Sequence, residues 1–138
     1  MFNRIQFKKI WEDEHLIECY VECKSKAVEV KNNIYTSAEI INKLYCALSD
    51  YCNNNVKTCF WENIEKKQNI TSYISLSFKP ISKTGHILIE VCMENGDSES
   101  EEMHRCCFRM KTELGLVSQF KDSLRTFASS SIGSSIYM

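Results

Sequence analysis

The residues in this chain most capable of chemistry are its eight cysteines and three histidines. Four such residues bind zinc only when their donor atoms lie about 4 Å apart around the metal. Cys19 and Cys23 would share one face of a strand, but four residues of strand would separate them by about 13 Å. Cys106 and Cys107 are adjacent and would point to opposite faces of a strand. The spacing therefore does not predict a metal site, and only ligands from distant segments would supply one.

The cysteines are more simply explained as small apolar residues, because free cysteine is among the most buried residue types. Cys59 and Cys107 are the two that we expect to be exposed and open to oxidation. Four others lie in segments of alternating polarity and are expected in or beside the core: Cys19, Cys23, Cys92 and Cys106. The first residues have no apolar export signal, so we expect a reducing cytoplasm, where disulfides are rare.

Familiar catalytic and nucleotide-binding motifs do not occur in the chain. It has no GxSxG turn, no P-loop, no HExxH pair and no GxGxxG loop. Its four glycines leave no glycine-rich loop to cradle a phosphate. We therefore predict a protein that is not an enzyme and has no cofactor. A cysteine and a histidine brought together by folding remain the enzymatic alternative.

Charge is balanced over the whole chain and uneven locally. The 17 basic and 18 acidic residues give a net charge of −1, which argues against a dedicated nucleic-acid-binding protein. Five of the nine residues 94–102 are acidic, and Asn95-Gly96 is a tight-turn signal, so we expect an acidic loop between two strands. Such a loop is either simply solvated or binds a basic partner. The candidate partner-binding residues here are Asp97, Glu99, Glu101 and Glu102.

Two aromatic residues complete the candidate binding site. Trp61 and Tyr73 are expected on or near the outward faces of their strands. Tryptophan and tyrosine are enriched at the centres of protein interfaces, so an exposed aromatic face would be a contact surface. The alternative is that the tryptophan fills the edge of the core.

Two periodicities define the elements that must position these residues. Alternation of apolar and polar residues predicts strands half-buried against one layer. The predicted strands lie near residues 5–7, 17–23, 28–30, 56–61, 70–78, 87–93 and 106–110. Thr36 and Glu39 form a capping box that opens a helix, and Asn53 to Asn55 would end it. A second helix is expected from near Thr112, with one apolar stripe.

The resulting order, β-β-β-α-β-β-β-β-α, predicts a two-layer α+β domain. In this arrangement, two helices cover one face of an antiparallel sheet of about six or seven strands. The length of 138 residues is typical of one domain, which we place at residues 1–128. Residues 129–138 are rich in serine and glycine and are expected to form a flexible tail.

Three segments have the layout of a known family. They are Ile34 to Ile41, which opens the first helix, its continuation from Leu44 to Leu48, and Phe108 to Lys111 running into Leu116 to Leu124. Over roughly residues 15–128 this layout resembles the small WapI-like immunity proteins of bacterial polymorphic and contact-dependent toxin systems. The resemblance implies a cytoplasmic, non-enzymatic protein that binds and neutralises a cognate toxin domain, without contacting nucleic acid or membrane. The alternative is a structural or protein-interaction module of unknown partner, such as a homodimer formed through an exposed sheet face.

Overall fold

The computed structural model of the chain describes residues 3–65, 72–97 and 99–138. Its elements in chain order are β1 (Arg4–Glu12), β2 (Ile17–Lys24), β3 (Glu29–Thr36), α1 (Ala38–Cys52), β4 (Cys59–Glu62), β5 (Ser72–Pro80), β6 (His86–Asp97), β7 (Glu102–Glu113), α2 (Leu114–Phe127) and β8 (Ser135–Tyr137). The expected α+β class, with antiparallel strands and two helices, is confirmed. The first two residues of the strand expected at 70–78 lie outside the described residues.

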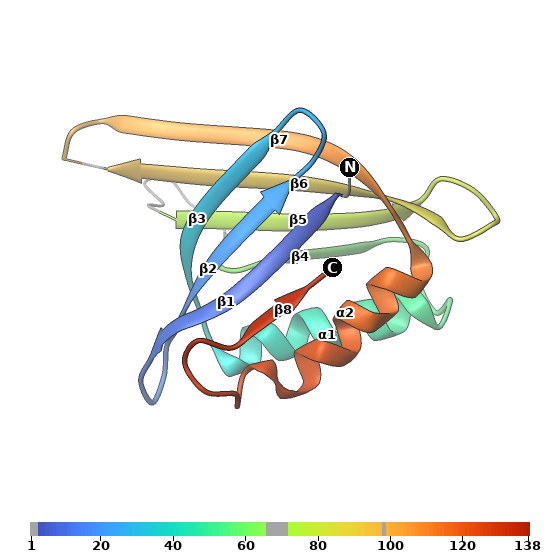
Figure 1. Cartoon of the computed structure of the whole chain (residues 1–138), viewed down its shortest axis with the longest axis horizontal. Coiled ribbons are helices and arrows are strands. Elements are labelled where there is room, and N and C mark those ends of the chain that lie inside the picture. Colours follow the sequence, from blue (N-terminus) through green and yellow to red (C-terminus); the bar gives the residue numbers. More distant parts are fainter. Residues whose placement is uncertain (1–2, 66–71, 98) are drawn as a thin grey trace.

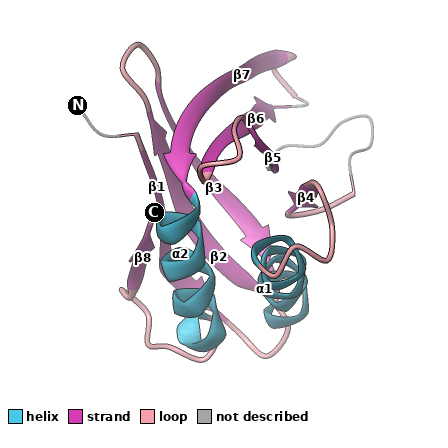
Figure 2. Cartoon of the chain, turned by 90° about the vertical axis from the view of Figure 1, so that its right-hand side faces the viewer, coloured by secondary structure: helices cyan, strands magenta, loops and turns pink. Residues whose placement is uncertain are grey.

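The strands form two antiparallel sheets of four rather than one larger sheet. Sheet A has the order β3-β2-β1-β8, and sheet B has the order β4-β5-β6-β7. Strands of the two sheets cross one another. The helices α1 and α2 pack side by side and cover one side of the space between the two sheets (Figures 1 and 2). Alternation in sequence tells which side chains share a face of a strand, but not which strand pairs with which. The division into two sheets was therefore not visible in the sequence.

One core fills the space between the two sheets and the two helices. The ring of Phe7 in β1 lies near its centre, with its centroid 6.1 Å from that of Trp61, 5.6 Å from Phe120 and 6.5 Å from Phe127. Trp61 is only 4% exposed, and its Nε1 donates a hydrogen bond to the carbonyl oxygen of Ile40 at 2.9 Å. The expectation of an outward Trp61 is thus corrected in favour of the core.

Both ends of α1 are capped by the kinds of residue that the sequence predicted, but the N-cap is one residue later than expected. Ser37, not Thr36, is the N-cap, and its Oγ accepts from the Ile40 amide at 3.2 Å. At the other end Asn53 caps the helix and Asn54 has a φ of 61°, the left-handed conformation that asparagine tolerates. None of the helices in the described ranges has the length and apolarity needed to cross a bilayer.

The C-terminal residues are fastened to sheet A instead of forming the expected flexible tail. β8 pairs with β1, so that Phe7 lies opposite Ile136. The buried ammonium of Lys9 donates to the Ala128 carbonyl at 2.7 Å and to the Ser130 carbonyl at 2.8 Å. A buried charge requires such partners, and here they are supplied by the end of α2 and the turn that follows it. The serine-rich composition of the C-terminal segment does not indicate this attachment, because Lys9 lies about 120 positions before the carbonyl groups that it binds.

Buried asparagines bind the edge strand β3 to sheet B. The Asn32 side-chain amide donates to the Glu94 carbonyl at 3.2 Å, and its Oδ1 accepts from the side-chain Nδ2 of Asn95 at 2.8 Å. The Asn63 side chain donates to the Tyr35 carbonyl at 3.1 Å. These bonds satisfy amides that would be costly to bury unpaired. The two Asn32 bonds also restrain β6 near the end of its pairing with β5.

Candidate functional site

The β6–β7 hairpin is the longest strand pairing among the described residues, with 12 residues in each strand. The first residue of β5, Ser72, lies opposite Asn95, so the two strands continue beyond β5 to the pair formed by Asp97 and Glu102 (Figure 1). The tight turn expected at Asn95-Gly96 is not there, because Gly96 pairs with Met103 inside the ladder. The last pair of the ladder is Asp97–Glu102, and residue 98 lies outside the described part.

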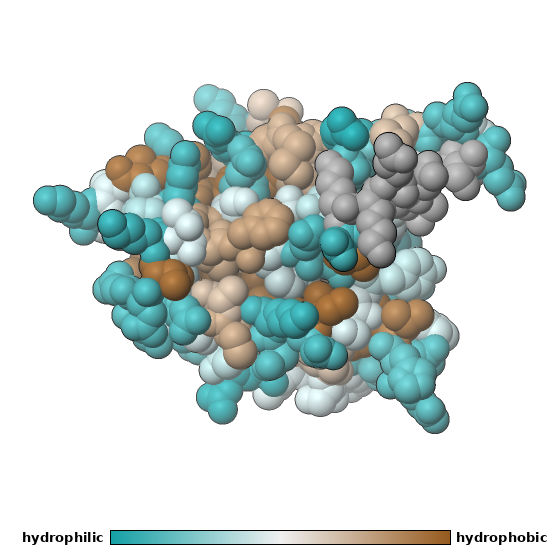
Figure 3. Space-filling model, turned by 180° about the vertical axis from the view of Figure 1, so that it is seen from behind, coloured by the Kyte–Doolittle hydropathy of each residue, from teal (hydrophilic) through white to brown (hydrophobic). Residues whose placement is uncertain are grey.

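We call residues 97 and 99–103 the hairpin tip. Glu99, Glu101 and Glu102 are exposed there, and Asp97 lies opposite Glu102 in the ladder. Met103 adds a large apolar side chain that is 55% exposed. Seen from behind, the hairpin tip is a hydrophilic projection at the right of the molecule (Figure 3). The structure therefore brings the backbone of all four acidic candidates to one end of the hairpin, where Glu99, Glu101 and Glu102 are exposed.

Three consecutive cross-strand pairs follow on the outward face of the hairpin. They are Glu94–Arg105, Cys92–Cys107 and Glu90–Arg109. The outer two are ion pairs, and the middle pair is a disulfide with Cα atoms 4.2 Å apart. Opposite charges and bonded cysteines placed directly across two strands hold those strands in register. The hairpin is thus a stiff support for its tip.

The disulfide corrects the expectation that Cys92 is a reduced core residue. The separation of 15 residues between Cys92 and Cys107 does not by itself predict a disulfide. Only the pairing of β6 with β7 places the two cysteines opposite each other. Cys107 is exposed, as expected, but Cys59 is buried at 5% exposure, because β4 turns it toward the core. Burial raises the pKa of the Cys19 and Cys59 thiols to about 12, which makes both poor nucleophiles at neutral pH.

Among the described residues, no group of three or more histidine, cysteine, aspartate or glutamate side chains is arranged to hold a metal ion. His104, the histidine nearest to Cys106 in sequence, instead places its Nε2 3.1 Å from Glu102 Oε1. The interaction is on the surface, since both side chains are more than two-thirds exposed.

The two aromatic candidates do not join the acidic residues in one surface. Trp61 belongs to the core, and Tyr73 is also only 4% exposed. The Tyr73 hydroxyl donates to Glu62 Oε1 at 3.3 Å, and burial is the largest cause that raises its pKa. The outward aromatic residue of β4 is Phe60, at 59% exposure, which the sequence analysis missed. Only the alternation within β4 could have indicated that Phe60 faces outward. β4 has four residues, and a shift of one residue in the assumed alternation exchanges its two faces.

The stiff hairpin, its acidic tip and the exposed Met103 are the features that a partner could recognise. Electrostatic complementarity would act through the carboxylates, and the methionine would supply apolar contact. A comparison of the chain with models of known protein families, with curated proteins and with solved structures finds no significant match.

Proposed function

We propose that this protein is a non-enzymatic cytoplasmic binding protein that docks a basic protein surface with its hairpin tip. In the form that the resemblance to WapI-like immunity proteins implies, the partner is a cognate bacterial toxin domain. The observation that carries the proposal is the exposed cluster of Glu99, Glu101 and Glu102 at the end of a hairpin that projects beyond β5.

Pre-organisation supports this role. Binding costs less when the docking element is already ordered, because little conformational entropy is then lost on association. The Asn32 bonds to β6 and the ion pairs on the outward face restrain the hairpin before any partner arrives. The ion pairs act whether Cys92 and Cys107 are oxidised or reduced, so the proposal does not depend on the redox state of the compartment.

The proposed inhibition is steric and electrostatic. Enzymes that cleave nucleic acids carry basic surfaces that normally hold phosphates. A row of carboxylates would occupy such a surface in place of the phosphates, and Met103 would fill an apolar depression beside it. Complementary charge would speed the encounter and select the partner, as it does at other charged interfaces.

The alternative, a homodimer or other interaction module, is favoured by one different observation. β7 pairs with β6 on one side and is the last strand of sheet B on the other. Its outer edge carries backbone groups that a second strand could pair with, except where the Asn3 side chain donates to the Lys111 carbonyl at 2.8 Å. Sedimentation equilibrium separates the two functions, because the alternative predicts a dimer without any partner.

The direct test of the immunity function is growth rescue. We expect the gene immediately upstream to encode a large secreted protein with a toxic C-terminal domain. Expression of that domain in a bacterial host should stop growth, and co-expression of this protein should restore it. Restoration should be lost when Asp97, Glu99, Glu101 and Glu102 are changed to lysine.

The matched control changes four exposed acidic residues elsewhere to lysine: Glu14, Glu39, Glu65 and Asp122. The two variants have the same net charge, since each carries four reversals, so a difference between them reports position rather than charge. Loss of rescue in both variants, or in neither, would remove the hairpin tip from the mechanism. Absence of rescue by the unmodified protein would contradict the immunity function itself.

A further inference from the structure

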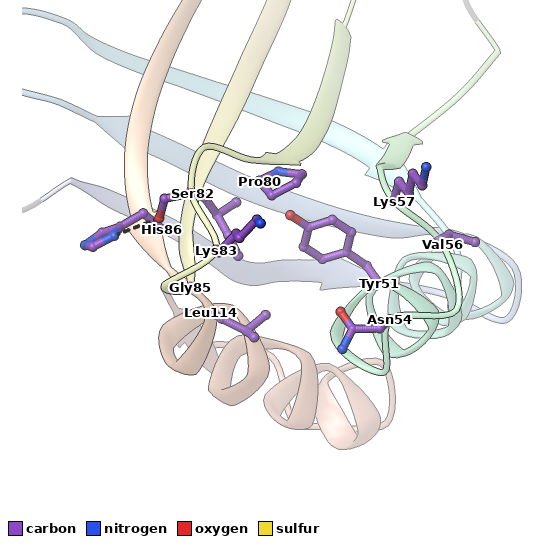
Figure 4. A pocket seen from close by; sticks show the side chains of 11 residues that line it. Tyr51, Asn54, Val56, Lys57, Pro80, Ser82, Lys83, Gly85, His86 and Leu114 are labelled. Atoms are coloured by element: carbon purple, nitrogen blue, oxygen red, sulfur yellow. Dashed lines mark hydrogen bonds between the residues drawn. The ribbon is translucent and has the colours of Figure 1, made fainter.

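A cavity of about 550 Å³ lies at the opposite end of sheet B from the hairpin tip. β6 begins at this cavity with His86 and ends at the tip with Asp97, about 36 Å away along the strand. The walls come from the end of α1 and the segment after it, the β5–β6 turn, and the first residue of α2 (Figure 4). Its volume is in the range of about 300–1,000 Å³ that is typical of small-molecule sites.

The hydroxyl of Tyr51 is the polar group that this cavity leaves unused. Tyr51 is 94% buried, since its exposed fraction is 6%. Its side chain points into the cavity toward the β5–β6 turn, and no hydrogen bond to another described residue satisfies its hydroxyl (Figure 4). The ring is buried, but the hydroxyl oxygen is not sealed from solvent, so it can donate a hydrogen bond to a ligand that enters the cavity. Burial raises the Tyr51 pKa, so the hydroxyl stays protonated and is available as a donor.

The charged side chains that line the cavity are lysines. Lys83 faces Tyr51 from the β5–β6 turn, and Lys57 lies on the opposite rim (Figure 4). None of the lining residues is acidic, and in the described part of the chain neither lysine has a carboxylate within 4.0 Å. His86 supports the turn instead of facing the cavity, because its Nδ1 lies 3.2 Å from the Ser82 hydroxyl and its ring points outward.

The two helix ends add nothing to the recognition of a negative ligand. α2 begins at Leu114 on the cavity wall, and its N-cap residue Glu113 already places a carboxylate at the positive end of the helix, although it makes no side-chain capping bond. The carbonyls at the end of α1 are already bonded, since the Asn54 amide donates to Tyr51 and the Asn55 amide to Asp50.

We propose that this cavity binds a small organic anion with an apolar body. Its anionic head would lie between Lys83 and Lys57 and accept a hydrogen bond from the Tyr51 hydroxyl. Its body would contact the apolar walls formed by Pro80 and Leu114. The cavity is separate from the hairpin tip, so this proposal does not depend on the proposed protein partner.

The test compares two fluorescent probes that share one aromatic body. Anilinonaphthalene sulfonate carries a negative charge, and N-phenyl-1-naphthylamine lacks it. We expect the sulfonate to bind more tightly, and the Lys57→Gln/Lys83→Gln variant to bind it about three- to tenfold more weakly while binding the neutral amine unchanged. The control variant, Lys8→Gln/Lys26→Gln, removes two exposed lysines far from the cavity in sequence and should bind both probes like the unmodified protein.

Nuclear magnetic resonance locates the bound probe. The sulfonate should shift the amide signals of residues 51–57 and 81–87 and leave those of residues 99–103 in place, and Tyr51→Phe should weaken binding without altering the fold. Equal sulfonate binding by the cavity variant and the control variant would overturn the proposal. Shifts confined to other surfaces, or no preference for the charged probe, would overturn it as well.

Discussion

Replacing Lys9 with methionine should destabilise the protein strongly, although methionine is also unbranched and only one heavy atom shorter. The ammonium of Lys9 has no exposure to solvent. It is held by three acceptors, which are Glu12 Oε2 at 3.0 Å and the carbonyls of Ala128 and Ser130. Methionine would fill the same channel and provide none of the three bonds.

The magnitude follows from the groups left behind. Each carbonyl that loses its donor costs about 1–3 kcal/mol if it stays buried. The Glu12 side chain is 38% exposed and regains water, so its contribution is small. Relief of the desolvated ammonium acts in the opposite direction. We expect a loss of about 3 kcal/mol in the free energy of unfolding, or about 10 °C in Tm for a chain of this size.

Urea unfolding of Lys9→Met and of Lys8→Met measures this loss. Lys8 is the exposed neighbour in β1, so its change should stay within about 0.5 kcal/mol. Hydrogen exchange supplies a second readout, because the Met138 amide bonds to the Ile5 carbonyl at 2.8 Å and should lose protection when the C-terminal segment detaches. A loss below about 1 kcal/mol with protection of Met138 unchanged would refute the role assigned to Lys9.

Three further predictions concern the hairpin and the core. Reduction of the Cys92–Cys107 bond, or the Cys107→Ser change, should lower the free energy of unfolding measured in urea by about 3 kcal/mol, because the bond closes a loop over a separation of 15 residues. The control change Cys46→Ser removes a free, exposed thiol and should have little effect. Iodoacetamide at pH 8 should label exposed Cys46 quickly and Cys19 only on unfolding, since the raised pKa keeps the Cys19 thiol protonated; labelling of both at one rate in mass spectra would contradict this. Asn32→Ala should cost about 1–3 kcal/mol in thermal unfolding and speed amide exchange in β6, and a neutral result would show that the two sheets do not depend on this side chain.

Local patterns in the sequence predicted the parts of the fold that depend on local physics. The asparagines after α1 were expected to end that helix, and Asn54 does so with its left-handed backbone. The apolar stripe of the second helix was also correct, because Val117, Phe120 and Leu124 are buried. Helical spacing and capping chemistry are properties of neighbouring residues, so a single sequence contains them.

Features that need a distant partner were not predictable in the same way. The Cys92–Cys107 bond exists because β6 and β7 are in one register, and β8 is held because Lys9 reaches the end of α2. Trp61 was assigned to the wrong face because β4 has only four residues, too few for the phase of its alternation to be read. The acidic composition of residues 94–102 correctly predicted that Glu99, Glu101 and Glu102 are exposed, because charged side chains are seldom buried without a partner. Glu94 of the same segment is only 6% exposed, and its pairing with Arg105 across the hairpin could not be predicted from composition.

The affinity for the proposed partner, a toxin domain that we expect to be encoded upstream, tests the central claim most directly. Association and dissociation rates should be measured for the unmodified protein, for the lysine variant of the hairpin tip and for the matched lysine variant of the four distant acidic residues. We predict that the tip variant associates at least about tenfold more slowly, with a weaker dependence on salt, while the control variant keeps most of its affinity. Equal loss in both variants, or tight binding by the tip variant, would contradict the claim that the hairpin tip is the docking surface.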